Sequence, residues 1–149
     1  MLAEAQALWE QFERVHHEIF HWSDGLSDDQ LNWKPPAKDI NSIGNLISHI
    51  LGAELFAVVN RIGGLPVNRD RSAEFSHRST RAGLLQRRAE VEAHVREALN
   101  NLTAADLHRV VATRNGEAPA GKFLLYLLSH VSGHMGQVIM TRKLLDSQP

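Results

Sequence analysis

The chain has 149 residues, a formal net charge of −1, 43% hydrophobic and 22% charged residues, and no cysteine. These values are typical of a soluble globular protein that buries a core without a metal or a disulfide, so we expect one domain over residues 1–149. The lack of cysteine excludes disulfides, thiolate metal ligands and a cysteine nucleophile. Because no basic stripe or run of like charge is found, we expect no nucleic-acid partner.

Neither a targeting segment nor a membrane span is expected from the sequence. The N-terminal residues 1–6 lack a basic region followed by a long apolar run, so no signal peptide is predicted. The longest uninterrupted apolar run, residues 123–128, is too short to cross a bilayer. We therefore expect a cytoplasmic protein with no membrane partner.

Four segments show the apolar spacing of helices and predict an all-α fold, a single four-helix bundle. The first segment covers residues 2–22 and ends before Gly25. The second runs from about Ser42 to Ile62 and ends at two glycines. No strand-like alternation of useful length is found in the chain.

The third predicted helix begins near Ser79 or Thr80, which are both good N-cap residues. The fourth runs from about Ala120 to Leu145. Because the start of this last segment is apolar nearly all round, we expect it to be the most buried helix of the bundle.

The two halves of the chain resemble each other in two places. Residues 46–52, LISHILG, match residues 127–133, LLSHVSG, and LSDDQL upstream of the first matches LTAADL upstream of the second. The two upstream segments fit capping boxes that open short helices. A duplication would place His49 and His130 at equivalent positions, with Gly52 and Gly133 letting backbones come close. Chance similarity between apolar helices explains the matches equally well.

Three histidines form the main candidate site. His130 and His134 are four residues apart on the fourth helix, so they share one face, with Cβ atoms about 6 Å apart. Two such rings can bind one ion at about 2.1 Å from each nitrogen. The stripe of His130 and His134 continues through Tyr126 and Gln137 and is expected to face inward. His49 lies on the face of the second helix that carries Leu46 and Phe56, so it can point into the same interior.

Three neutral imidazoles without a carboxylate leave coordination positions open for water or substrate, which is typical of a catalytic metal site. The alternative is that these histidines are ordinary core residues with hydrogen-bond partners. Burying three unpaired imidazoles without a common partner would cost on the order of several kcal/mol, which favours the metal site.

Other polar residues are candidates for supporting roles, and none is assigned as catalytic. Tyr126 and Gln137 lie on the stripe of His130 and His134, and Gln137 either orients a bound water or fixes a helix contact. Glu54 is either a base or extra ligand near the site, or one partner of a surface or interhelix ion pair.

The remaining histidines are interpreted without a metal. His17 and His21 are also four residues apart, but they lie off the apolar stripe and predict a surface pair. His16 flanks that stripe and can reach the interior. Three further histidines have no partner at ligand spacing and are predicted on the surface: His77, His94 and His108.

This pattern resembles the DinB/YfiT-like superfamily of four-helix metalloproteins. The resemblance rests on SIGNLISH (residues 42–49), on LNWKP (residues 31–35), and on HVSGHMGQ (residues 130–137), which fits the family signature H-x-x-x-H-[RM]-G-Q. Met135 stands where many members have arginine. The resemblance implies an up-down-down-up bundle, often a homodimer, that binds nickel or zinc, with iron or manganese as further candidates.

The leading hypothesis is a metal-dependent enzyme in which the ion lowers the pKa of a water or a substrate thiol. The resemblance implies a low-molecular-weight thiol or another small-molecule substrate, in a transferase, isomerase or hydrolase reaction. The alternatives are a non-catalytic metal-binding, stress-related or interaction bundle, and a structural dimer with unmetallated histidines. A pocket open to solvent above the metal would favour the enzyme. A site closed off by side chains would favour the non-catalytic metal-binding protein.

Overall fold

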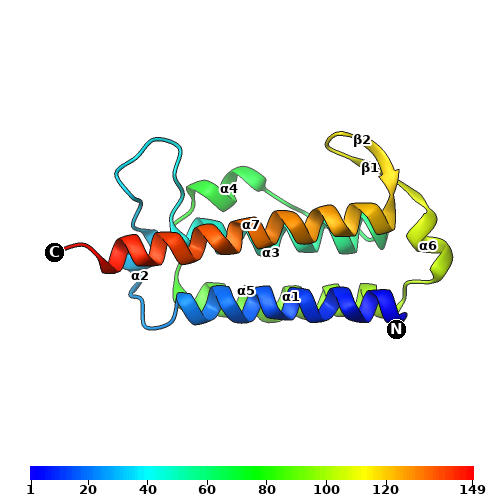
Figure 1. Cartoon of the computed structure of the whole chain (residues 1–149), viewed down its shortest axis with the longest axis horizontal. Coiled ribbons are helices and arrows are strands. Elements are labelled where there is room, and N and C mark those ends of the chain that lie inside the picture. The colour runs from blue at the N-terminus through cyan, green and yellow to red at the C-terminus, as the bar shows by residue number, and fades with distance from the viewer.

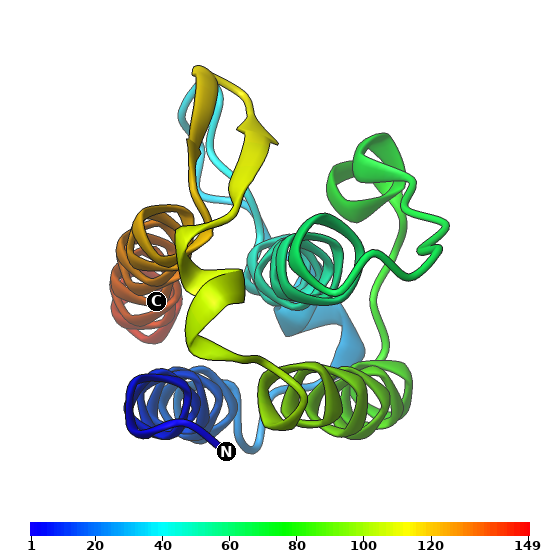
Figure 2. The same ribbon diagram turned by 90° about the vertical axis from the view of Figure 1, so that its right-hand side faces the viewer.

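The computed structural model describes residues 1–149 and is mostly helical. Its elements in chain order are α1 (Ala3–Trp22), α2 (Asp28–Asn32), α3 (Ile43–Glu54), η1 (Leu55–Ile62), α4 (Arg71–Ser76), α5 (Arg81–Asn100), α6 (Ala104–His108), β1 (Val110–Thr113), β2 (Gly116–Pro119) and α7 (Ala120–Asp146). The long helices α1, α3, α5 and α7 lie along one axis (Figure 1), and the end-on view in Figure 2 shows them packed side by side. α7 contacts α1 and α3, and α5 contacts α1, α3 and η1.

The predicted starts of α3 and α5 agree with the structure because a local side chain caps each of these two helices. Ser42 caps α3 by accepting a hydrogen bond from the Asn45 backbone N–H. Thr80 caps α5 by accepting one from Gly83. After α1 ends, Gly25 adopts a positive φ of 71°, a conformation that favours glycine.

Both predicted capping boxes are present and open short helices. Ser27 and Gln30 satisfy each other's backbone N–H groups at the start of α2. Thr103 and Asp106 do the same at the start of α6. The layout of a long helix, a short capped helix, a link and a second long helix is therefore repeated in the two halves of the chain.

The prediction that the last helix is the most buried is wrong. In α3, 11 of 12 residues are buried, because α2, α4, α5 and α7 all pack around it. α7 leaves large apolar side chains in solvent, with Leu125 63%, Tyr126 59% and Met140 60% exposed. An apolar segment can thus lie at the edge of a bundle, where neighbours cover only one side of it.

The segment Ile43–Ile62, which joins α3 and η1, is long and apolar enough to cross a membrane. However, 83% of its apolar window is buried within the bundle, as is typical of a core helix. Its second part, η1, is a π-helix, in which for example the Gly63 N–H donates to the Val58 carbonyl. The apolar spacing of the sequence does not reveal this change of helix type.

A small β-hairpin corrects the prediction that the chain contains no strand. β1 and β2 pair antiparallel, and Val111 and Ala118, which lie opposite each other, are both buried. Each strand has only four residues, too few for a visible alternation. The one available signal was the dipeptide Asn115-Gly116, a frequent hairpin turn, in which Gly116 has a φ of 107°. In Figures 1 and 2 the hairpin stands on the same side of the bundle as α4.

Three long helices meet at a buried polar cluster around His16 of α1. Its Nε2 lies 2.8 Å from Glu54 Oε2 of α3, and its Nδ1 lies 2.9 Å from Glu92 Oε1 of α5. Both His16 and Glu54 are fully buried. Burial alone would lower the pKa of His16, but the carboxylates of Glu54 and Glu92 raise this pKa to about 9. Burial raises the pKa of Glu54, and the neighbouring His16 opposes this effect.

The raised pKa of His16 predicts a loss of stability at alkaline pH. The folded chain keeps a proton on His16 that the unfolded chain releases near pH 6.5. The stabilisation is thus fully present below pH 6.5 and is lost as the pH rises through about 9. We expect the free energy of unfolding, measured with urea, to fall by about 3 kcal/mol across this range. The double variant His16→Leu/Glu54→Leu should lack this component, and an equal pH dependence in both proteins would contradict it.

Candidate metal centre

The structure brings together the three histidines predicted to form a site. His49 comes from α3, and His130 and His134 lie one turn apart on α7. One ring nitrogen of each lies within 4.8 Å of the corresponding nitrogens of the other two. The Nε2 atoms of His49 and His130 are 3.0 Å apart. Two nitrogens bound tetrahedrally to one zinc ion at 2.1 Å would be about 3.4 Å apart, so the spacing suits a shared ion.

The histidine cluster lies at the edge of the α3–α7 contact rather than on the bundle axis. His49 is only 3% exposed, whereas His134 is half-buried and His130 is exposed. The buried row of α7 consists of other residues, including Leu124, Leu127, Val131 and Val138. The expectation that the His130 stripe faces the core is therefore corrected: the stripe lies beside the core, where ions and small molecules can reach it.

A carboxylate that the sequence analysis did not identify holds His49. Glu74 of α4 places its Oε2 2.8 Å from His49 Nδ1. Arg69 binds the same carboxylate with two hydrogen bonds, from Nε to Oε1 at 2.6 Å and from Nη2 to Oε2 at 2.8 Å. Burial alone would raise the pKa of Glu74, but the His49 ring and the Arg69 guanidinium lower it below its ordinary value.

An ionised carboxylate can only accept hydrogen bonds, so His49 must donate its Nδ1 proton to Glu74. With its one proton on Nδ1, a His49 ring has its lone pair on Nε2, the atom that lies 3.0 Å from His130 Nε2. A carboxylate behind a histidine ligand, fixing its orientation and tautomer, is a frequent feature of metal sites.

Gly52 makes room for this carboxylate. A Cβ atom at position 52 would lie 2.1 Å from Glu74 Oε1, which is far inside van der Waals contact. Gly52 and Gly133 were predicted from the sequence to let helix backbones approach each other. Instead, Gly52 receives a side chain from α4, and Gly133 has nothing within 4 Å of its ideal Cβ position.

The three predicted supporting residues have different surroundings. The Gln137 side-chain oxygen lies 2.7 Å from His134 Nδ1, which fits an acceptor that fixes this ring. Tyr126 lines a cavity whose wall also includes His49 and His130. Glu54 bonds to His16, as in the ion-pair alternative of the sequence analysis.

His130 and His134 are held in the neutral form that a metal requires. Partial desolvation of the His130 ring by its neighbours lowers its pKa to about 4, with further lowering by His134, His49 and two nearby arginines. Burial also lowers the pKa of His134, and the acceptor Gln137 only partly offsets this. At neutral pH, the lone pairs of these rings are therefore available to a cation.

A large cavity adjoins the histidine cluster. It has a volume of about 730 Å³, and its wall includes His49 and His130, the hairpin and the start of α7. A volume of this size accommodates a small-molecule ligand. The site is therefore not plugged, and a molecule in the cavity can reach the histidines.

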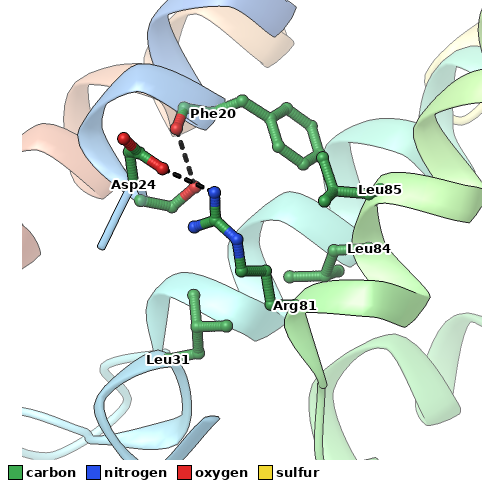
Figure 3. Close-up of a pocket in the computed structure, with 7 residues that line it drawn as sticks. Phe20, Asp24, Leu31, Arg81, Leu84 and Leu85 are labelled. Atoms are coloured by element: carbon green, nitrogen blue, oxygen red, sulfur yellow. Dashed lines mark hydrogen bonds and ion pairs between the residues drawn. The ribbon is translucent and has the colours of Figure 1, made fainter. Parts of the chain in front are cut away.

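A second, smaller cavity of about 210 Å³ lies between α1, α2 and the start of α5. Its polar side chains are already paired: Arg81 binds Asp24, as Figure 3 shows. The Ser23 hydroxyl donates to the Phe20 carbonyl. Leu31, Leu84 and Leu85 form the rest of the wall shown there. We assign no function to this cavity.

The other histidines, apart from the buried His16, lie on the surface as predicted. His17 and His21 stack with ring centroids 6.1 Å apart, and both are exposed. The three histidines without a partner at ligand spacing are also exposed: His77, His94 and His108.

The fold and the site together define a class of protein, a helical bundle with a three-histidine cluster that can hold a metal ion. A family model described as the DinB superfamily matches residues 11–138, and the chain belongs to this superfamily. A comparison with curated proteins gives no significant match.

Similar solved structures share the fold at low sequence identity. A conserved protein from Enterococcus faecalis has a TM-score of 0.79 and 16% identity, covering 99% of this chain and 100% of that chain. A DinB-like protein from Bacillus cereus has a TM-score of 0.74 and 18% identity, covering 93% and 91%. A DinB-like protein from Bacillus subtilis has a TM-score of 0.69 and 19% identity, covering 95% and 93%.

Proposed function

We propose that His49, His130 and His134 hold one divalent metal ion and that the protein is a metal-dependent enzyme acting on a small molecule. The observation that carries the proposal is the convergence of three imidazole nitrogens within 4.8 Å at the wall of an open cavity. Three nitrogen ligands without a carboxylate suit nickel or zinc, with iron and manganese as the next candidates.

When bound there, a divalent ion supplies Lewis-acid chemistry that lowers the pKa of a thiol or a water at an open coordination position. The chain's own residues provide orientation and access. Glu74 and Arg69 fix the His49 ring, and Gln137 fixes the His134 ring. The cavity brings the substrate to the exposed side of the cluster. The reaction class we propose is thiol transfer, isomerisation or hydrolysis.

A non-catalytic metal-binding or stress-related protein is the second candidate, and one observation favours it. General acid–base catalysis needs a side chain that is free to exchange protons, and a carboxylate is one such group. The carboxylate nearest the cluster, Glu74, is already bound by Arg69 and His49, and Glu54 is buried against His16. Neither of these two carboxylates is therefore free to act as the acid or base in turnover.

The family resemblance and the fold also suggest how the chain is organised. We propose one domain over residues 1–149 with up-down-down-up helices, located in the cytoplasm, which binds neither nucleic acid nor membranes. We further propose a homodimer formed through the exposed apolar face of α7, which includes Leu125 and Met140. Sedimentation of the wild type and of Met140→Glu tests the dimer, because a buried glutamate pair should drive it to monomer.

The proposed function is tested by metal analysis and a reaction screen. Protein purified without a histidine tag should bind one equivalent of zinc or nickel. The metal-loaded protein should then consume glutathione, bacillithiol or mycothiol in the presence of an electrophile. Metal binding without turnover of any thiol or hydrolysable substrate would reject the enzyme and support the non-catalytic metal-binding protein. No metal binding would reject both candidates.

Replacing Glu74 with glutamine should weaken metal binding without unfolding the protein. The amide keeps the size of the side chain but loses the charge that Arg69 and His49 share. Loss of such a supporting group typically costs about 10- to 100-fold in metal affinity. Competition titration with a chromophoric zinc chelator measures the change. Glu90→Gln on the exposed face of α5 is the matched control, and equal affinities of both variants would contradict this role.

A further inference from the structure

The cavity beside the histidines has a strongly basic wall. Its lining contains Arg61, Arg69, Arg71, Arg114 and Lys122, but only one acidic residue, Glu117. The chain as a whole has a net charge of −1, so this concentration of cations is local. A cavity lined by one sign of charge raises the local concentration of ligands of the opposite sign.

Most of these cations are not neutralised within the protein. Arg69 is bound to Glu74, but none of the other four basic residues forms an ion pair with a carboxylate. Arg61 and Arg71 instead lie over the rings of Phe56 and Phe75, at 5.1 and 5.3 Å from the ring centroids. A guanidinium stacked on an aromatic ring can still donate its N–H groups to an anionic oxygen. One Arg61 guanidinium N–H already donates to the Ala112 carbonyl, and its other guanidinium N–H groups have no partner.

The cations come from separate parts of the chain that meet only in the fold. Arg61 lies in η1, Arg71 begins α4, Arg114 lies at the tip of the hairpin, and Lys122 lies in the first turn of α7. The hairpin is the element that brings Arg114 to the cavity. Apolar surface is also present, because Phe56, Phe123 and Tyr126 line the same cavity.

We infer that this cavity binds the anionic end of a small molecule whose other end reaches the histidines. The shared chemistry is a carboxylate or phosphate group held by Arg61, Arg71, Arg114 and Lys122, with the apolar part of the ligand on the aromatic rings. The inference rests on the proposed function for the role of the histidines. Among low-molecular-weight thiols, it selects those that carry carboxylates over uncharged ones.

The test measures binding of a blocked thiol, so that it does not depend on turnover. S-methylglutathione carries two carboxylates and no free thiol, and glycerol 3-phosphate serves as the phosphate probe. The charge-reversal variant Arg114→Glu/Lys122→Glu is compared with Arg87→Glu/Lys143→Glu, which makes the same charge change outside the cavity. Isothermal titration calorimetry gives the affinities, and elemental analysis gives the metal content of each protein.

We expect at least one probe to bind the wild type, the affinity to fall about tenfold or more in Arg114→Glu/Lys122→Glu, and the control variant to bind like the wild type. Binding should also weaken as salt is added. Tighter binding of S-methylglutathione would identify the ligand's anionic group as a carboxylate, and tighter binding of glycerol 3-phosphate would identify it as a phosphate. No binding of either probe, or equal binding by the two charge variants, would overturn the inference.

Failure of this inference can be told apart from failure of the proposed function. Zinc bound by the wild type at one equivalent, together with no charge-dependent probe binding, would reject the basic cavity and leave the metal centre. Charge-dependent probe binding by a protein that takes up no zinc would reject the metal centre and leave the anion site.

Discussion

Replacing His134 with alanine should weaken zinc binding by at least about 100-fold, which corresponds to about 2.7 kcal/mol. His134 provides one of three clustered ring nitrogens, and no carboxylate in the cluster can replace it. Loss of a supporting group alone weakens metal affinity by up to about 100-fold. Loss of a direct ligand should therefore weaken it by at least this much. With only two imidazole ligands left, water would fill the other coordination positions of the ion.

His134 is a better choice for this experiment than His49. His134 is half-buried, and its acceptor Gln137 is exposed, so truncation leaves no buried polar group without a partner. The same change at His49 would leave the largely buried Glu74 without one of its donors.

The control for His134→Ala is His94→Ala, which removes an exposed histidine of α5. Both variants should unfold at urea concentrations close to that of the metal-free wild type, since surface changes usually have small effects. Equilibrium dialysis with zinc, followed by elemental analysis, gives the stoichiometry and the affinity. If His134→Ala retained one equivalent of zinc at wild-type affinity, the proposed metal centre would be wrong.

The second large effect concerns stability, and we expect it for His16→Leu. This change leaves the carboxylate of Glu54 fully buried without its ring partner, while its other oxygen already has no hydrogen bond. Breaking a buried pair from one side costs about 3–5 kcal/mol, because an uncompensated charge stays in the core. A domain with a stability of about 5–15 kcal/mol would lose a large part of it.

The double variant His16→Leu/Glu54→Leu tells whether unpaired charge is the cause. Replacing both partners by apolar residues removes the penalty, so most of the lost stability should return. His17→Leu, one residue away on the exposed face, should change stability by less than about 0.5 kcal/mol. Urea unfolding at pH 7 followed by circular dichroism measures all four proteins. Equal destabilisation in the single and double variants would instead indicate a packing defect.

The parts of the fold that the sequence predicted are those that local patterns determine. The helix N-termini at Ser42 and Thr80 depend on a side chain that binds a backbone N–H three residues away. The shared face of His130 and His134 follows from their spacing on one helix. The approach of His49 to these two is a long-range contact, and it was predicted because a third histidine occurs in another apolar helix.

The parts that were missed depend on contacts between distant segments. Glu74 is 25 residues from His49 in sequence, in a six-residue helix without a buried residue, so no periodicity identified it. The available signal was chemical: a buried histidine ligand usually has an acceptor behind its second nitrogen. The exposure of α7 was missed because apolar composition does not specify how many neighbours surround a helix.

Gly52 and Glu74 are expected to vary together among members of the superfamily. A methyl group at position 52 would occupy the space of the carboxylate, so a chain with alanine there would have to hold its histidine in another way. Sequences that keep all three histidines should therefore divide into two groups, one with glycine and an acidic residue at these positions and one with neither. Such covariation would show from sequence alone which relatives share this support for the ring.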